Sequence, residues 1–556
     1  MLRPLLLLLA LQPPAGPAAE RVSVTVLATT DTHGNLLPYD YFTKQAAPRG
    51  LAAIATLVES VRRETKNTLL VDCGDTIQGS PLASVYELER REGRTRDPEP
   101  MMLAMNALGY DAMAVGNHEY NFGLEALQAA RASARFPWLS ANTETGGAVP
   151  PFAPYLVKTV AGVKLAVIGL TTPVIPQWEK PEHIRGLSWL DPVTAVRRAL
   201  AALEAERPDV ILVAVHGGLG RDPETGVAGP NESPGENPVW SLAETFPQLT
   251  AIVFGHTHKR EPGRRVNGVL LVQPRNWAAE LARIDVALES EPGGRFKVTS
   301  ATSQLLAVTA ETPPDPRIAA LARPYHEATE RSLDTPVAES AVDLSGARGR
   351  FEDGALVDLI HEAQLHYAGA QVSFASLFQA QLRVKPGPVT RRELAALYLY
   401  ENELYAVEGD GRMVREALEN SARYYLTCPE ASCSHGPLVD RGIPGFNFDT
   451  AQGVEYELDL RQPVGKRITN LRYHGAPLRD DQPLRIAVNS YRAAGSAGYT
   501  MFRGAKVVWR SNREIRELLA DYWGEKKELP AKPDGNWRLL PPGVVETLAR
   551  EESGAR

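Results

Sequence analysis

Five short polar motifs constrain the fold and chemistry of this chain more than any other feature, because each directly follows a run of β-branched or aliphatic residues. They are Asp31-Thr32-His33-Gly34-Asn35, Gly74-Asp75, Gly116-Asn117-His118-Glu119, His216-Gly217-Gly218 and Gly255-His256-Thr257-His258. Each motif places carboxylate, amide or imidazole groups where a predicted strand ends. Loops at the carboxyl ends of strands form the ligand sites of layered α/β sheets, so these groups can converge.

The polar groups of these motifs are suited to holding a pair of divalent metal ions. The predicted ligands are Asp31, His33, Asp75, Asn117, His216, His256 and His258. Oxygen and imidazole ligands accept Mn, Zn, Co, Fe or Ni, which leaves the metals open. A lone strand-end histidine is usually structural, and a glycine before it can mark only a turn. Five such motifs in order favour a two-metal site that binds phosphate and activates water.

Two further histidine features need separate interpretations. His118 follows the predicted ligand Asn117, so it can lie beside the metals and protonate a leaving alkoxide, the alternative being an orienting role. His361 and His366 resemble a zinc-protease helix, but they are five residues apart instead of four. They would not share a helical face, so we predict no metal site there.

The first half of the chain alternates between strand-like and helix-like segments, which predicts layered α/β packing. Strands are expected at 22–29, 68–73, 112–115, 163–170, 210–215 and 251–254, and helices at 51–64, 100–108 and 192–206. A Pro-rich boundary at 311–316 precedes a predicted connecting helix at 318–332. Beyond it we expect helices at 351–367 and 390–400, and strands at 454–460, 468–473 and 484–489. The chain after Asp521 is polar and predicts a poorly packed tail.

These patterns divide the chain of 556 residues into five expected parts. They are a signal peptide (1–19), a catalytic domain (20–312), a linker helix (313–336), a substrate-binding domain (337–525) and a polar tail (526–556). Arg3, the apolar run 5–11 and the small residues Gly16, Ala18 and Ala19 are typical of a secretory signal. A membrane anchor is the weaker alternative, because a span needs about 20 apolar residues. We expect a secreted or periplasmic protein.

Charge and cysteine content narrow the partners and the compartment. The net charge is −7 and no basic block is present, which argues against a polymeric nucleic acid and leaves small phosphorylated substrates. Cys428 and Cys433 lie close together, so a local disulfide is expected, with two free thiols as the alternative. Cys73 ends an apolar run and is expected in the core. The oligomeric state is not predicted.

The five motifs resemble those of the calcineurin-like metallophosphoesterases, and most of residues 22–525 resembles the two-domain 5′-nucleotidase family within them. The second half supports this with Leu397-Tyr398-Leu399-Tyr400-Glu401-Asn402, Asn447-Phe448-Asp449 and Asn489-Ser490-Tyr491-Arg492-Ala493. The resemblance implies a four-layer α/β/β/α catalytic domain and a smaller α+β C-terminal domain. It implies that one metal is held by Asp31, His33, Asp75 and His258, and the other by Asp75, Asn117, His216 and His256. His118 would be catalytic.

The same resemblance implies that two aromatic rings clamp the nucleobase. Tyr491 matches one clamp position, and Phe446 is the candidate for the other. The alternative is that both rings belong to the core. Because Tyr491 lies in a Gly/Ala-rich stretch, we expect it to be the more exposed of the two.

Two departures bear on the branch of the family. The 5′-nucleotidase branch pairs its catalytic histidine with an Asp three residues later, where this chain has Asn121. An Asn-Gly-Gly-x-Arg stretch of that branch is replaced here by Ala375-Ser376-Leu377-Phe378-Gln379. Both resemble the periplasmic branch that acts as a 2′,3′-cyclic-nucleotide 2′-phosphodiesterase and 3′-nucleotidase. A 5′-nucleotidase or UDP-sugar hydrolase is the alternative, and a secreted nucleotide-binding protein without activity is a third.

Overall fold

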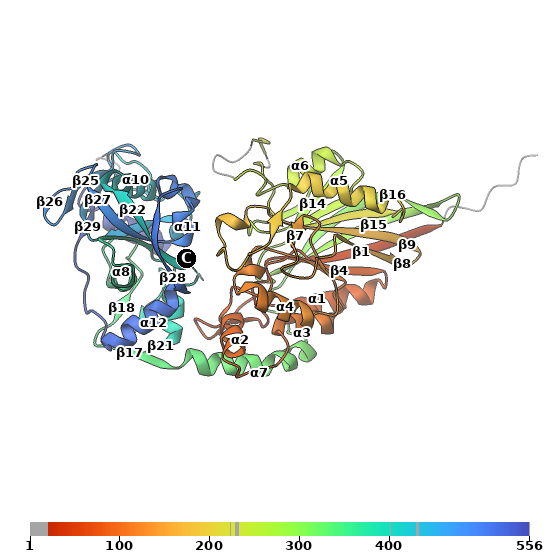
Figure 1. Cartoon of the computed structure of the whole chain (residues 1–556), viewed down its shortest axis with the longest axis horizontal. Helices are drawn as coiled ribbons and strands as arrows, with labels where there is room; N and C mark the ends of the chain where they lie inside the picture. The colour runs from red at the N-terminus through yellow and green to blue at the C-terminus, as the bar shows by residue number, and fades with distance from the viewer. Residues whose placement is uncertain (1–19, 223, 228–232, 401, 430–432, 555–556) are drawn as a thin grey trace, which may run out of the picture.

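The computed structural model describes residues 20–222, 224–227, 233–400, 402–429 and 433–554. Two lobes lie side by side, and the helix α7 (Pro316–Leu333) runs along one side of the molecule between them (Figure 1). This helix covers the predicted helix at 318–332, and it packs against helices of the first lobe. The signal peptide predicted for residues 1–19 lies outside the described residues.

The first lobe is built on two six-stranded mixed sheets. The first contains, in spatial order, β16 (Arg295–Ala307), β15 (Glu280–Glu291), β1 (Arg21–Thr29), β4 (Thr68–Asp72), β5 (Ala112–Ala114) and β6 (Trp138–Leu139). The second contains β13 (Glu261–Val266), β14 (Val269–Gln273), β12 (Ala251–Phe254), β11 (Val210–His216), β9 (Val163–Thr171) and β8 (Tyr155–Val160). Both sheets have parallel central strands, which explains their almost continuous apolar sequences.

The two sheets pack face to face, and helices cover their outer faces. Val26, Val71, Val167 and Val253 belong to one buried cluster that joins both sheets. A second cluster joins the first sheet to α1 (Leu51–Glu64), α3 (Pro100–Leu108) and α4 (Gly123–Ser133). A third joins the second sheet to α5 (Pro192–Leu203) and α6 (Val239–Thr245). The expected four-layer α/β/β/α arrangement is therefore confirmed.

The second lobe has an α+β core, as expected. Its five-stranded sheet contains β23 (Asp449–Gln452), β19 (Val372–Ser376), β27 (Pro483–Asn489), β22 (Glu403–Asp410) and β28 (Val507–Glu514). The helices that pack around this sheet are α8 (Ala355–Ala368), α9 (Arg391–Leu397), α10 (Gly411–Ala422) and α12 (Ile515–Lys526). A four-stranded sheet contains β26 (Ala476–Pro477), β25 (Ile468–Tyr473), β24 (Glu455–Asp459) and β29 (Trp537–Leu540).

The short remaining elements complete the loops. They are α2 (Pro81–Arg91), α11 (Ser490–Ala493) and the two-stranded ribbons β2–β3 (Tyr39–Asp40, Gln45–Ala46), β7–β10 (Thr143–Glu144, Ser188–Trp189), β17–β21 (Pro336–Ser340, Gly387–Thr390) and β18–β20 (Leu344–Ser345, Arg383–Val384).

The expectation of a poorly packed tail after residue 526 is wrong. The strand β29 pairs in parallel with β24, and the helix α13 (Val544–Gly554) follows it. Trp537, Val544 and Leu548 are buried in the core of the second lobe. These apolar residues are widely spaced among charged ones, so local composition hides a segment that completes the four-stranded sheet.

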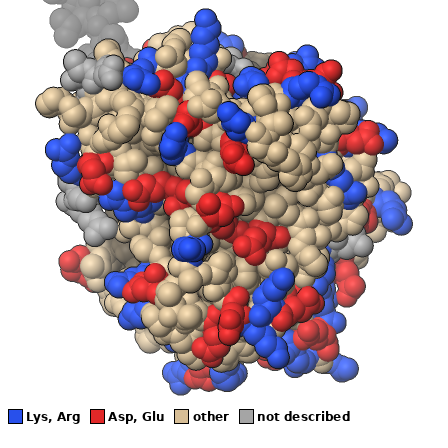
Figure 2. Space-filling view, turned by 90° about the vertical axis from the view of Figure 1, so that its left-hand side faces the viewer, with Lys and Arg blue, Asp and Glu red and all other residues tan. Residues whose placement is uncertain are grey.

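The cysteines lie as the sequence predicts. Cys428 and Cys433 form a disulfide, and Cys73 is a buried free thiol at the end of β4. Within the described ranges, no helix is both long and apolar enough to cross a membrane. Figure 2 shows acidic and basic side chains interspersed over the outer face of the second lobe.

Candidate metal centre and active site

The carboxyl ends of the central strands of both sheets meet at one edge of the first lobe. β1, β4 and β5 are parallel neighbours in one sheet, and β11 and β12 are parallel neighbours in the other. Each strand is followed at once by one of the five motifs, and His216 is the last residue of β11. The two sheets therefore bring all seven predicted ligands together, although the chain separates them by more than 200 residues.

The seven side chains form two adjoining groups. In the first, the Nε2 atoms of His33 and His258 are 3.0 Å apart, and His258 Nε2 is 3.5 Å from Asp31 Oδ1. In the second, His216 Nε2 is 2.9 Å from Asp75 Oδ2 and 3.0 Å from Asn117 Oδ1.

Asp75 connects the two groups. Its Oδ2 is also 3.9 Å from His33 Nε2, so this carboxylate faces both groups. His256 joins the second group, with donor atoms of Asp75, His216 and His256 all within 4.8 Å of one another. The geometry is consistent with Asp75 as the residue shared between two ions.

The hydrogen bonds behind the histidines fit metal ligation. His33 Nδ1 lies 3.0 Å from the carbonyl of Gln78, and His216 Nδ1 lies 3.0 Å from the carbonyl of Cys73. Each Nδ1 must carry a proton to donate to a carbonyl, so Nε2 is the ring nitrogen that faces the cluster. At His216, Nε2 meets a carboxylate oxygen and an amide oxygen, and either a proton on Nε2 or a bound cation reconciles these three atoms. A cation satisfies all three, so the donor set fits divalent metals.

The backbone at the ligands is held in an uncommon conformation. Asp31, His33, Asp75, His256 and His258 have φ of 48°, 47°, 57°, 72° and 54°, all in the left-handed region. This conformation costs of order 1–3 kcal/mol at a non-glycine residue and persists only where the surroundings impose it. Five such residues lie at one edge of the first lobe. The fold therefore imposes a strained backbone that brings the candidate ligands together.

Electrostatics within the cluster is strong. Burial acts to raise the pKa of Asp31, but hydrogen bonding to His258 and the charge of His216 together lower it to about 2. Burial acts to lower the pKa of His216, but the charge of Asp75 raises it to about 10. Burial, assisted by the charge of His258, lowers the pKa of His33 to about 4. The carboxylates are thus held ionised, as anionic ligands require.

Glu119 supports the metal loops, a role that sequence analysis missed. Its fully buried carboxylate accepts hydrogen bonds from the backbone N–H groups of Gly116 (2.6 Å), Asp75 (2.8 Å), Thr76 (2.6 Å) and Ile77 (3.3 Å). The side chain therefore joins the loop after β4 to the loop after β5.

We predict that Glu119→Gln destabilises the first lobe by about 2–4 kcal/mol, because its amide NH₂ would face backbone donors and leave them unpaired. Urea unfolding followed by fluorescence measures the change. The matched control is Glu125→Gln, whose side chain is 88% exposed and pairs with Arg90. Equal stability of the two variants would contradict the assigned role.

His118 lies beside the ligands at the start of a polar chain. Its Nε2 is 3.9 Å from Asp75 Oδ2, and its Nδ1 is 2.5 Å from Asn121 Oδ1. Asn121 Nδ2 donates to Glu179 Oε2 at 2.6 Å, and Glu179 Oε1 is 2.9 Å from His183 Nδ1. Because a carboxylate only accepts, Glu179 fixes the Asn121 amide with its oxygen toward His118. His118 Nδ1 therefore keeps its proton and donates it in a hydrogen bond to Asn121 Oδ1, so that Nε2 faces the centre.

The second lobe brings aromatic side chains toward this centre. The helix α11 lies on the side of the second lobe that faces the catalytic lobe (Figure 1). Burial and the charges of Asp75 and Glu179 raise the pKa of Tyr491. Tyr400 and Phe446 have ring centroids 6.2 Å apart. Phe446 is 39% exposed whereas Tyr491 is half-buried, so the expectation that Tyr491 is the more exposed ring is wrong. Tyr491 lies in the short helix α11 instead of a loop, and it is only partly exposed there.

Arg492 explains why the two C-terminal motifs occur together. Its guanidinium forms a bidentate pair with Asp449, with both N···O distances 2.8 Å, and donates to the carbonyl of Phe446 at 2.9 Å. Such planar pairs fix geometry as well as charge. The segment that carries Phe446 is therefore held against α11, which carries Tyr491.

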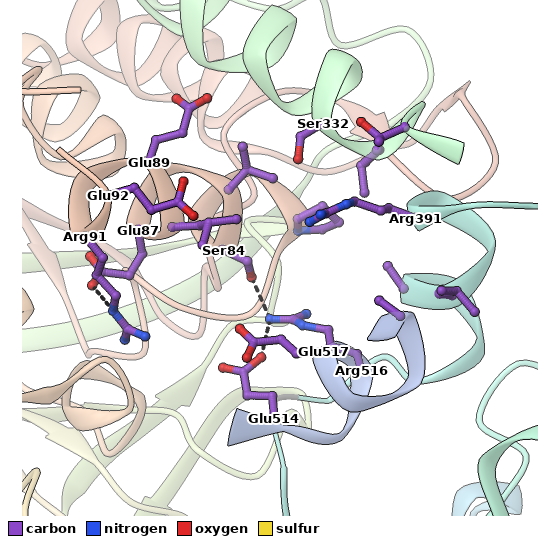
Figure 3. A pocket seen from close by; sticks show the side chains of 18 of the residues that line it. Ser84, Glu87, Glu89, Arg91, Glu92, Ser332, Arg391, Glu514, Arg516 and Glu517 are labelled. Carbon is purple, nitrogen blue, oxygen red and sulfur yellow. Dashed lines mark hydrogen bonds and ion pairs between the residues drawn. The ribbon is translucent and has the colours of Figure 1, made fainter. Parts of the chain in front are cut away.

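An ion pair and a hydrogen bond are among the contacts that connect the lobes. Lys180 Nζ, next to Glu179, is 3.0 Å from the buried Glu403 Oε1 of β22. On the side of α7, a cavity of about 740 Å³ lies between α2, α9 and α12, where Arg516 donates to Ser84 (Figure 3). None of the predicted metal ligands lines this cavity, so it is separate from the candidate centre.

His361 and His366 have different surroundings on α8. His361 is buried, with Nδ1 3.0 Å from Ser373 Oγ and Nε2 3.0 Å from Thr450 Oγ1, whereas His366 is exposed. Burial lowers the pKa of His361 to about 3.

The buried His361 predicts acid sensitivity of the second lobe. Its pKa is depressed on folding, so between pH 6.5 and about 3 the unfolded state binds the extra proton. The contribution of His361 to stability is therefore constant above pH 6.5 and falls below it by up to about 1.4 kcal/mol per pH unit. Urea unfolding at several pH values should show this slope weakened in His361→Gln but retained in the exposed control His435→Gln. Parallel profiles for wild type and His361→Gln would contradict the assignment.

Comparison with known proteins decides the family. The description "Calcineurin-like phosphoesterase" matches residues 24–260, and "5′-nucleotidase, C-terminal domain" matches residues 336–504. The chain belongs to the 5′-nucleotidase family. Its first lobe is the calcineurin-like phosphoesterase domain, and the Asp and His groups at the strand ends make it a metal-dependent phosphoesterase.

Several relatives of this family align along nearly the whole chain. The 2′,3′-cyclic-nucleotide 2′-phosphodiesterase/3′-nucleotidase of Salmonella typhimurium is 29% identical, over 94% of this chain and 90% of that protein. The 5′-nucleotidase of Vibrio cholerae is 28% identical, over 91% of both. The trifunctional nucleotide phosphoesterase YfkN of Bacillus subtilis is 30% identical over 94% of this chain, which spans only 39% of that protein.

Solved structures show the same two-lobe fold. A Staphylococcus aureus structure superimposes with a TM-score of 0.78 at 26% identity, covering 93% of this chain and all of that chain. The 5′-nucleotidase precursor of Thermus thermophilus superimposes with a TM-score of 0.63 at 24% identity, covering 93% of this chain and 99% of that chain.

Proposed function

We propose that this phosphoesterase is an exported enzyme that uses two divalent metal ions to open 2′,3′-cyclic nucleotides to 3′-nucleotides and then removes the 3′-phosphate. The observation that carries the proposal is the His118–Asn121–Glu179 chain beside the two ligand groups, with an amide where the 5′ branch has a carboxylate. Three relatives named as 2′,3′-cyclic-nucleotide 2′-phosphodiesterase/3′-nucleotidase, each covering 94% of this chain, support it.

The metals would be held by the seven side chains at the strand ends, with Asp75 shared between them. When bound, they supply positive charge for the phosphate and lower the pKa of water. His118 Nε2 would give a proton to the departing ribose 2′ or 3′ oxygen, while Asn121 holds Nδ1 and keeps the ring in place. Glu179 keeps the Asn121 amide from flipping.

The second lobe would bind the nucleobase. Tyr491 and Phe446 are presented on elements locked together by Arg492 and Asp449. We predict that Tyr491→Ala raises KM by roughly 5- to 150-fold, since stacking on a base contributes about 1–3 kcal/mol. Steady-state kinetics should show kcat within a few-fold of wild type. An unchanged KM for every nucleotide tested would contradict the assignment of Tyr491 to the nucleobase site.

Export has two sources of support. The N-terminal sequence is typical of a signal peptide, and the Cys428–Cys433 disulfide fits an oxidising compartment. Fractionation of the producing cells should place mature protein, lacking the first 19 residues, outside the cytoplasm. Full-length protein in the cytoplasm would contradict export.

A 5′-nucleotidase is the second candidate, because the Vibrio 5′-nucleotidases match at 28% identity. Turnover of 2′,3′-cyclic AMP, 3′-AMP, 5′-AMP and a UDP-sugar by one preparation, with chelator and with added Mn²⁺ or Co²⁺, separates the two. The proposal expects the first two substrates to have the highest kcat/KM. Dominance of 5′-AMP or the UDP-sugar would assign the enzyme to the 5′ branch. Nucleotide binding without metal-dependent turnover would indicate a protein without activity.

A further inference from the structure

A third group of carboxylates lies in the second lobe, far from the catalytic centre in sequence. Asp353 precedes α8, Asp358 is in the first turn of α8, and Asp534 is in the loop before β29. One carboxylate oxygen from each lies within 4.8 Å of the other two. Two oxygens that are each about 2.4 Å from one Ca²⁺ ion are at most about 4.8 Å apart, so this spacing suits one ion.

Two oxygens of the group have no hydrogen bond. Asp358 is only 6% exposed, yet its Oδ2 has no partner, and neither does Oδ1 of Asp353. A buried carboxylate oxygen without a partner is costly. The N-terminus of α8 favours negative charge, but it supplies no hydrogen bond to these atoms.

The charges that act on this group are themselves negative. The side chains that most affect Asp358 electrostatically are Asp353, Asp534 and Glu362, all carboxylates. Asp534 and the adjacent backbone are nevertheless held in place, because Gly535 N donates to Asp353 Oδ2 at 2.6 Å and Asn536 Nδ2 donates to the carbonyl of Ala451 at 2.8 Å. A well-bonded loop thus brings three carboxyl groups together, and burial with these acidic neighbours raises the pKa of Asp358 to about 8.

We propose that Asp353, Asp358 and Asp534 form a structural Ca²⁺ site that fastens the loop before β29 to the start of α8. An all-oxygen, carboxylate-rich set with one exposed member is the ligand type that Ca²⁺ prefers, with waters completing the coordination. The site differs from the catalytic one, whose ligands include imidazoles. It stabilises the second lobe because it joins the final strand of the four-stranded sheet to the core helix.

The test is thermal unfolding of the full chain, with its catalytic metals supplied as Mn²⁺, during Ca²⁺ titration. We expect the wild-type midpoint to rise by roughly 5–10 °C at a Ca²⁺ concentration 100-fold above Kd. Asp358→Asn and Asp534→Asn should lose this rise. The exposed control Asp481→Asn should keep it.

Calcium binding at the catalytic centre is distinguished with Asp75→Asn, which impairs that centre and should retain the rise. Calorimetry should then find one Ca²⁺ per chain in Asp75→Asn and none in the double variant Asp75→Asn/Asp358→Asn. An unchanged wild-type midpoint, or an equal rise in wild type and Asp358→Asn, would overturn the proposal. Neither result bears on the proposed nucleotide chemistry, because the two sites share no residue.

Discussion

Replacing His118 with Ala is expected to lower kcat for 3′-AMP and 2′,3′-cyclic AMP by about 10²–10⁴-fold, the usual contribution of a positioned proton donor. The ribose oxygen is a poor leaving group and needs the proton that His118 Nε2 supplies. Elemental analysis should find wild-type metal content, because His118 lies beside the ligands without being one of them. The exposed control His435→Ala should retain full activity.

A second substrate tests whether His118 acts by donating a proton to the leaving group. A p-nitrophenyl phosphate ester has a leaving group that departs without protonation, so His118→Ala should slow it much less than the nucleotides. An equal loss for both substrates would show that His118 positions the phosphate instead of donating a proton. Full activity of His118→Ala on nucleotides would end its catalytic assignment.

Replacing Asp75 with Asn is expected to reduce kcat/KM by on the order of 10³-fold or more, because preorganised charge at the reacting phosphate is lost. Asp75 Oδ2 faces His216 Nε2 at 2.9 Å and both His33 Nε2 and His118 Nε2 at 3.9 Å, so one substitution affects both ligand groups. Metal analysis after gel filtration should show fewer ions per chain than in wild type.

The Asp75→Asn experiment needs a folding check, because Asp75 Oδ1 also accepts the backbone N–H of His118 at 2.8 Å. An amide oxygen can accept that bond, so circular dichroism and the unfolding midpoint should change little. Wild-type metal content together with wild-type turnover would contradict a ligand role for Asp75. Loss of turnover with all metal retained would indicate that Asp75 contributes to the reaction without binding a metal.

The helices and strands of the catalytic lobe could be predicted because they depend on apolar patterns within short stretches of sequence. The helix α1 and the strand β12 begin and end where the apolar periodicity predicted, at Leu51–Glu64 and Ala251–Phe254. The metal motifs could be found because each is a few polar residues directly after such a strand. The motifs converge because they follow parallel neighbouring strands, whose carboxyl ends lie at the same edge of a sheet.

The missed residues depend on contacts between distant segments. Glu119 is part of a motif, but its partners Thr76 and Ile77 lie more than 40 residues earlier. Glu179 has no neighbouring pattern at all, and only the fold brings it to Asn121. The short helix α11, in which Tyr491 is only partly exposed, was not predicted from the Gly/Ala-rich stretch. Sequence patterns thus identified the candidate ligands but not the residues that hold and orient them.

The pairing of β24 with β29 has a consequence for how the polypeptide is made. The two strands are separated by about 80 residues, so at about 5–20 residues per second the ribosome takes roughly 4–16 s to deliver the second after the first. During that interval one edge of β24 has no neighbour and can recruit a strand from another nascent chain. Premature termination before Trp537 would make that exposure permanent, and shortened products should accumulate as aggregates.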